Sequence, residues 1–282
     1  MTTTTTKGYK LGARGAHNIS YGGQHPHLLP KFTSKKDERN HVLEHLCGAF
    51  RVFARRGFDE GEAGHISVRD PINPNTFWMN PLGIHFQFMI PLDLVHIDIT
   101  TGEFLNDGSK KPINKAGLMI HSNIYKHRTE VKSISHAHSV YGKLFSAFGR
   151  ELDMINQDVC IFYKRQCVFK NFGGVALESD EGTEIAFASQ GKAAVILQNH
   201  GLLTVGETVD EAAYLFCLLE KSCQIQLLVD SCNVKQKPHI IPEDVAEYSG
   251  YVVNDPETMY ASFQPDYERE VRLSQGEFLI TR

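Results

Sequence analysis

The stretch SISHAHS, residues 133–139, and the stretch QNHGL, residues 198–202, bring three histidines into a pattern typical of metal ligands. Residues 131–135 are expected to run as a strand. If they do, His136 and His138 point to the same face and lie about 7 Å apart along the strand. Both imidazoles can then reach one ion.

The third histidine, His200, follows the apolar run AAVIL at residues 193–197, which predicts a buried strand. Gly201 comes next and suits a sharp turn with close backbone approach. A single histidine at a strand end is more often a hydrogen-bonded residue than a ligand. Three histidines from two strand ends instead predict a metal site.

The same residues belong to a set of motifs. In chain order these are GHISVRDP (64–71), FWMNPLG (77–83), NKAGLMIHSNIY (114–125), HAH (136–138) and NHGL (199–202). Together they resemble the class II aldolase/adducin family in order and spacing, over about residues 40 to 235.

This resemblance implies an α/β fold, a three-layer α/β/α sandwich with a central, mainly antiparallel sheet. It also implies a homotetramer with active sites at subunit contacts. Residues 1–34 are expected to form a flexible arm and residues 35–235 the aldolase/adducin-like domain. Residues 236–282 are then a polar tail that can wrap a neighbouring subunit.

The resemblance also assigns roles. In the sugar-phosphate aldolases of the family, three histidines hold zinc, and His136, His138 and His200 occupy those positions here. The acidic base position falls on Gly117, which cannot transfer a proton. The phosphate-binding Asn and two serines are replaced by His65, Lys115 and Ala116. This form resembles the adducin head domain more than the sugar-phosphate aldolases.

An enzyme with glycine at the base position needs another proton carrier, and Asp158 and Tyr163 are the candidates. His65 and His85 fall where the family pattern puts substrate-contacting loops, so both are expected to line the substrate pocket. Lys115 can attract an anionic substrate group. Gly117 completes the expected substrate-binding set.

Composition limits the partners. The chain has 282 residues, a net charge of −4 and a pI near 6.4, without a basic block. These values argue against nucleic acid and against a polybasic membrane patch. No apolar stretch is expected to approach a membrane span, and no signal region is recognised, so a cytoplasmic protein with a small-molecule substrate is expected. The six cysteines lack paired C-x-x-C spacing, which predicts reduced thiols.

Three functions remain open. The leading one is a metal-dependent lyase of aldol or retro-aldol type, or an enolate-mediated isomerase or epimerase, with Zn(II) as the expected ion and a small hydroxy-carbonyl substrate. The second is a three-histidine Fe(II) oxygenase. The third is a non-catalytic, adducin-like binding protein. Replacement of the phosphate-binding residues argues against a simple sugar phosphate, and nearby aromatic residues suit a more apolar ligand such as a secondary metabolite.

Periodicity predicts the elements. Helices are expected over residues 36–56, 115–127, 139–148, 181–190 and 208–232, with shorter ones near 242–249 and 255–261. Short runs at 66–69, 76–79 and 94–98 predict antiparallel strands.

Overall fold

A seven-stranded sheet forms the centre of the computed structural model, which describes residues 14–171, 173–174 and 179–280. In the described chain the strand order is β3-β2-β1-β4-β7-β6-β5. Only β5 and β6 pair in parallel, and the other five neighbouring pairs are antiparallel. The strands are β1 (His65–Arg69), β2 (Thr76–Met79), β3 (Val95–Asp98), β4 (Ser133–Ala137), β5 (Gln166–Phe169), β6 (Ala194–Leu197) and β7 (Gly201–Gly206).

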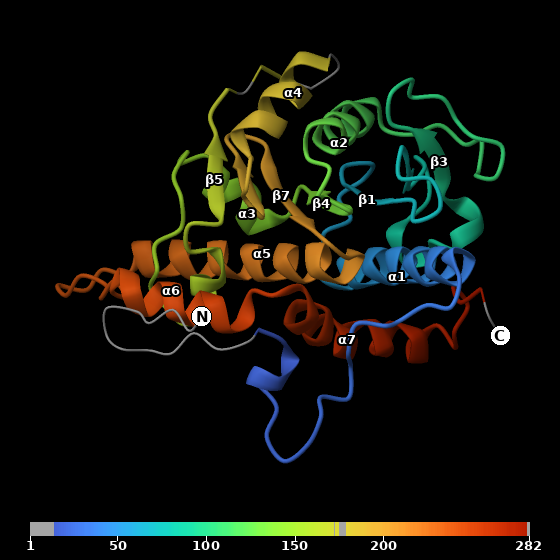
Figure 1. Cartoon of the computed structure of the whole chain (residues 1–282). Coiled ribbons are helices and arrows are strands. Elements are labelled where there is room, and N and C mark those ends of the chain that lie inside the picture. The colour runs from blue at the N-terminus through green and yellow to red at the C-terminus, as the bar shows by residue number, and fades with distance from the viewer. Residues whose placement is uncertain (1–13, 172, 175–178, 281–282) are drawn as a thin grey trace.

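Helices cover both faces of this sheet (Figure 1). α2 (Lys115–His127) and α4 (Ser179–Ala188) lie on one face, and α1 (Lys35–Arg55) and α5 (Val209–Ser231) on the other. α6 (Glu243–Val253) and α7 (Pro256–Leu273) form an outer row beyond α1 and α5. The shorter helices are α3 (Val140–Ser146), η1 (Ala16–Asn18), η2 (Phe86–Phe88), η3 (Pro91–Asp93) and η4 (Asp158–Phe162). The predicted α/β sandwich with a mainly antiparallel sheet is confirmed.

Each face of the sheet has its own apolar core. Ile134 and Leu203 belong to the cluster under α2 and α4, whereas Phe50, Ile66 and Phe216 belong to the cluster under α1 and α5. All five side chains are fully buried. Burying one side chain of this size contributes about 1.5–3 kcal/mol, so the two faces together hold the sheet rigidly beneath its loops.

Side-chain caps fix where the main helices begin. Ser34 accepts a hydrogen bond from the Asp37 N–H, and Thr208 accepts one from the Glu211 N–H. Asn114 caps α2 by accepting from the Gly117 N–H. Such caps satisfy backbone donors that the first turn of a helix leaves unpaired. The three helices begin within one residue of the starts predicted from the sequence.

Three features differ from the sequence prediction. β5 and β7 were not identified as strands, although β7 pairs with β4 and β6 in the middle of the sheet. The sharp turn before β7 places Asn199, with φ 59°, in the left-handed region, while Gly201 begins the strand. α7 runs for 18 residues, far beyond the predicted 255–261 segment, and packs against α1 and α5.

By length and composition alone, α5 is long and apolar enough to cross a membrane. The expectation that no apolar stretch approaches the length of a membrane span is therefore wrong. In the structure 56% of this apolar stretch of α5 is buried, and the helix packs against β7, α3 and α7. A core helix satisfies the same test, and this packing explains its apolar sequence.

Candidate metal centre

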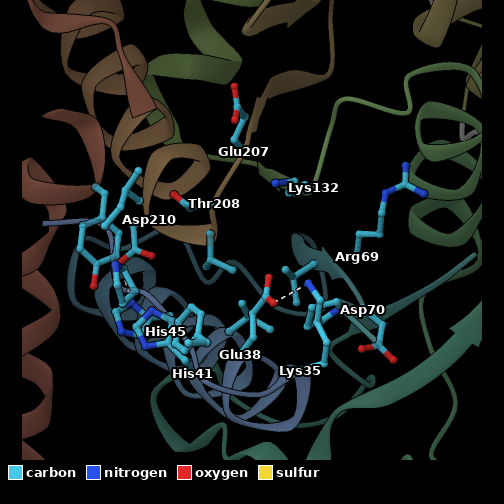
Figure 2. Close-up of a pocket in the computed structure, with 18 of the residues that line it drawn as sticks. Lys35, Glu38, His41, His45, Arg69, Asp70, Lys132, Glu207, Thr208 and Asp210 are labelled. Carbon is cyan, nitrogen blue, oxygen red and sulfur yellow. Dashed lines mark hydrogen bonds and ion pairs between the residues drawn. The ribbon is translucent and has the colours of Figure 1, made fainter. Parts of the chain in front are cut away.

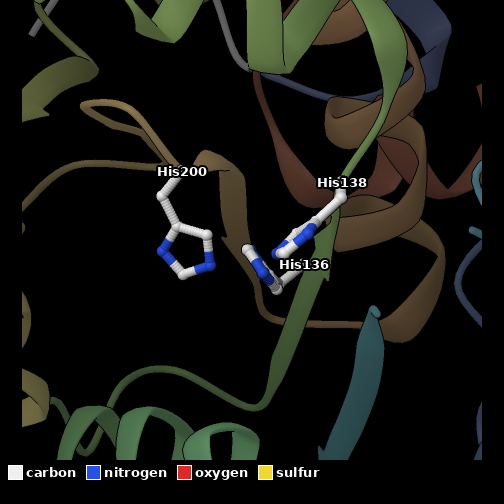
Figure 3. Close-up of side chains that lie close together, drawn as sticks. All are labelled: His136, His138 and His200. Atoms are coloured by element: carbon white, nitrogen blue, oxygen red, sulfur yellow. The ribbon is translucent and has the colours of Figure 1, made fainter. Parts of the chain in front are cut away.

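The three predicted histidines meet where β4 ends and β7 begins, in the middle of the sheet (Figure 3). His136 lies in β4, His138 directly follows β4, and His200 lies in the turn between β6 and β7. Because β4 pairs with β7, the register brings His136 opposite Leu203, close to that turn. One nitrogen from each imidazole lies within 4.8 Å of the other two.

The three rings surround a common point. The ring centroids of His136 and His138 are 5.2 Å apart, and the centroid of His200 is 4.9 Å from each of them. Their planes cross at 69° to 86°, so the rings present edges to one another instead of stacking. His136 is buried, whereas His138 and His200 are half-buried. The site is therefore open on the side of the last two.

Electrostatics keep these imidazoles neutral. Burial lowers the pKa of all three, and the pKa of His200 falls to about 4. The Nδ1 of His136 lies 2.8 Å from the Leu202 carbonyl, so Nδ1 donates and Nε2 keeps its lone pair. Three neutral imidazoles are a suitable ligand set for a divalent ion such as Zn(II) or Fe(II). The residues present fit a metal.

Two charged residues that the sequence analysis missed lie beside His138. Lys143 of α3 forms an ion pair with Glu60, which precedes β1. Both act on the pKa of His138: after burial, Lys143 lowers it and Glu60 raises it. The neighbouring Asp59 pairs with His85 at 2.8 Å, which places half-exposed His85, from the loop between β2 and η2, beside the loop of Asp59 and Glu60. No sequence spacing could have indicated a pair 83 residues apart.

His65 is buried directly against the triad. Its ring centroid is 4.7 Å from that of His136, and its Nδ1 is 2.7 Å from His121 Nε2. His121 Nδ1 is 2.6 Å from the Ser67 hydroxyl, which is 2.7 Å from the Tyr125 hydroxyl. These four groups form a buried line of hydrogen bonds that orients the His65 ring.

Gly117 faces the same ring. A Cβ at this position would lie 2.7 Å from His65 Cδ2, 2.9 Å from His65 Nε2 and 2.6 Å from the Met79 methyl group. A side chain at position 117 and the His65 imidazole thus compete for the same space. Gly117 contributes room to the site, and His65 is the polar group that fills it.

The remaining predicted residues lie elsewhere in the described chain. Asp158 is exposed in η4, which packs against α5 and α6, and Tyr163 ends that helix beside Lys164. Lys115 is exposed at the first turn of α2. The structure therefore gathers His65 and Gly117 around the triad, brings His85 to the adjoining loop, and leaves Asp158, Tyr163 and Lys115 outside within one subunit.

A cavity of about 670 Å³ lies at the opposite end of the sheet (Figure 2). It is lined by the ends of β1 and β7, the start of α5 and residues 29–35. Four of its lining residues pair with one another: Lys35 binds Glu38, and Asp210 accepts from His45 at 2.7 Å. None of the triad lines it, so the cavity and the histidine cluster are separate features.

The chain is similar to known proteins in sequence and in fold. Residues 44–227 match the model of the class II aldolase and adducin N-terminal domain. The chain is 45% identical to the meiotically up-regulated gene 14 protein of Schizosaccharomyces pombe, over 89% of this chain and 97% of that protein. It is 40% identical to decarboxylase NovR of Streptomyces niveus, over 85% and 87% of the two chains.

A third relative is the 4-hydroxy-3-prenylphenylpyruvate oxygenase/4-hydroxy-3-prenylbenzoate synthase of Streptomyces roseochromogenus subsp. oscitans, at 39% identity over 87% of this chain and 86% of that protein. Among solved structures, the L-fuculose 1-phosphate aldolase from Glaciozyma antarctica PI12 aligns with a TM-score of 0.80 and 39% identity, over 89% of this chain and 96% of that one. The family match, the fold and the enzyme-named relatives agree: the chain belongs to the class II aldolase and adducin family.

Proposed function

We propose that the chain is a metal-dependent lyase that cleaves a carbon–carbon bond next to a carbonyl or hydroxyl group of a small substrate. The observation that carries this proposal is the intact triad of His136, His138 and His200 with one open side, beside a Gly117 that leaves room for the His65 imidazole. Isomerisation or epimerisation, in which a carbon next to the carbonyl loses a proton, develops negative charge on that same carbon and remains within the proposal.

The metal would be held by His136, His138 and His200. A divalent ion in such a set acts as a Lewis acid that polarises a carbonyl or hydroxyl oxygen and stabilises charge on an adjacent carbon. The chain's own contribution is to present three neutral nitrogens, to fix the His136 tautomer through the Leu202 carbonyl, and to leave the half-buried side open for a substrate.

His65 is the best-placed group in this subunit to hold or move a proton. Hydrogen bonds along His65, His121, Ser67 and Tyr125 can run in either of two consistent directions. In one direction His65 Nε2 carries a proton, and in the other it offers a lone pair. The ring can therefore act as donor or acceptor towards a substrate oxygen without breaking the line.

We assign Asp158 and Tyr163 a role only across a contact between subunits; within their own chain, η4 packs against α5 and α6. The homotetramer that the family resemblance implies would supply such a contact. Under this proposal Asp158 and Tyr163 of a neighbouring copy take part in proton transfer at the site, together with His65 of the subunit that holds the metal.

The substrate class is inferred from the residues at the family's phosphate-binding positions and from the relatives. His65, Lys115 and Ala116 replace the phosphate-binding residues of the sugar-phosphate aldolases, which argues against a simple sugar phosphate. The names of two relatives include a decarboxylase and an oxygenase of a substituted phenylpyruvate. A 2-oxo or 2-hydroxy acid with an aromatic or otherwise apolar body fits both the metal site and these relatives.

An iron-dependent oxygenase is the second candidate. Its specific support is the relative named as an oxygenase, together with a triad that suits Fe(II) as well as Zn(II). Glycine at position 117 is then no obstacle, because that chemistry does not need the aldolase acid. A purely binding, adducin-like role is less well supported, because a binding protein has no need of a triad of neutral imidazoles.

Elemental analysis of untagged protein tests the proposal, with the His136→Ala/His138→Ala double variant as its control. Near-stoichiometric zinc that the variant lacks supports the lyase. The loaded protein is then assayed with aromatic 2-oxo and 2-hydroxy acids and with sugar phosphates, while an electrode records dissolved oxygen. Product without oxygen uptake supports the lyase, and iron-dependent uptake supports the oxygenase. A site that stays empty and cannot be loaded refutes both.

A further inference from the structure

A buried carboxylate supports the segment that follows His138. Glu220 lies in the middle of α5 and is 6% exposed. Its two oxygens accept hydrogen bonds from the Ser139 hydroxyl, from the Tyr141 N–H at 2.9 Å and from the Gly142 N–H at 2.7 Å. All three donors lie within four residues of the metal-ligand position.

These hydrogen bonds cap α3 from another helix. Ser139 occupies the N-cap position of α3, but its side chain makes no capping hydrogen bond to the helix. The Glu220 carboxylate instead satisfies first-turn N–H groups that would be left unpaired in a buried place. Its negative charge also suits the positive end of the helix. The start of α3 is therefore held by α5.

The same turn is pressed against the other half of the site. A Cβ on Gly142 would lie 2.6 Å from the Leu202 side chain, so only glycine allows α3 to approach β7 this closely. Leu202 lies two residues after His200, and its carbonyl orients His136. The anchored first turn of α3 thus holds the backbone after His138 against β7. β7 directly follows His200, and its Leu202 carbonyl orients His136.

We propose that Glu220 is a positioning residue for the metal centre, acting through Ser139 and the first turn of α3. The inference rests on the proposed metal site. The role requires an acceptor at both side-chain oxygens of Glu220, because one faces the Tyr141 N–H and the other the Gly142 N–H, which can only donate. Glutamine has one oxygen acceptor and one NH2 donor, so in either orientation its NH2 group would face the Tyr141 N–H or the Gly142 N–H.

The test titrates the full-length apoprotein with Co(II), whose visible absorption reports the geometry of its ligands, and with Zn(II) in competition. Glu220→Gln is compared with the wild type and with Glu270→Gln. Glu270 is an equally buried glutamate, 3% exposed, whose partner is Arg55, and it lies in α7 away from the triad. Loss of a group that orients a ligand weakens metal binding by about 10 to 100-fold.

We expect Glu220→Gln to raise the Co(II) dissociation constant by about this factor and to change the Co(II) spectrum. Glu270→Gln is expected to lower the unfolding midpoint while leaving both unchanged. If Glu220→Gln binds Co(II) like the wild type with the same spectrum, Glu220 supports the fold only and the inference is overturned. If the wild type itself binds no metal, the proposed metal site falls together with the inference.

Ser139→Ala provides a second variant in case Glu220→Gln does not fold. It removes one of the three donors and leaves the two N–H groups in place. A loss of Co(II) affinity relative to the wild type, with an unfolding midpoint near that of the wild type, supports positioning. Unchanged affinity in a folded Ser139→Ala protein refutes a route through Ser139.

Discussion

Substitution of Glu211 by glutamine is predicted to stabilise the protein at pH 8 and to have much less effect at pH 5. Glu211 is 3% exposed in the first turn of α5. Burial raises its pKa from 4.5 to about 7, against the opposing effects of the Glu207 N–H and Arg165. The folded protein therefore binds this proton more tightly than the unfolded chain does.

The sign and size follow from linkage. Between about pH 4.5 and 7 the unfolded chain has released the proton and the folded protein still holds it, so this group makes stability fall as pH rises. A difference of about 2.5 in pKa corresponds to about 3 kcal/mol, an upper limit because Arg165 lies only 3.7 Å away. Glutamine has no proton to lose, and its oxygen can still accept from the Glu207 N–H.

Urea unfolding of both proteins at pH 5 and pH 8 measures this effect. The difference in unfolding free energy between Glu211→Gln and the wild type is expected to move in favour of the variant by about 1–3 kcal/mol between the two pH values. Other titrating groups, including the three triad histidines, are common to both proteins and cancel. If the variant instead loses stability at pH 8 relative to pH 5, the ion pair with Arg165 outweighs burial, and the reasoning is refuted.

Three further outcomes are expected. Chelator should lower the thermal midpoint of the wild type but not that of His136→Ala/His138→Ala, since an ion stabilises only a fold that binds it; an equal effect on both would contradict the triad. Gly117→Ala should cost about 1–3 kcal/mol in urea unfolding by crowding His65, and a neutral result would show that the ring moves freely. Ser67→Ala should cost about 1–3 kcal/mol, because two buried partners lose a hydrogen bond.

The sequence was sufficient to predict the helices and the site residues whose signals lie in short, continuous stretches of the chain. The α2 prediction matches Lys115–His127, and α1 and α5 begin one residue from their predicted starts, because apolar periodicity and capping residues coincide there. The triad was also predictable, because two of its members share one strand end and the third follows an apolar run. Such signals need no knowledge of distant contacts.

What the sequence could not show depends on contacts between distant segments. The line from His65 to His121 joins residues 56 apart, and Glu220 reaches Ser139 across 81 residues. Nothing in either local pattern marks these residues as partners. α7 was underestimated for a related reason: its polar sequence carries a weak signal, and its length is stabilised by packing against α1 and α5.

The antiparallel pairing of β4 with β7 gives the metal a further part in folding. Successive side chains on a strand point to opposite faces, so a slip of one residue between β4 and β7 would turn His136 away from His200 and disperse the site. An ion that needs all three imidazoles therefore binds only the correctly aligned sheet. By mass action, a bound ion would lower the population of misregistered forms, and the effect would grow with the ratio of its free concentration to its dissociation constant. The ion would then favour the correct alignment of the central strands.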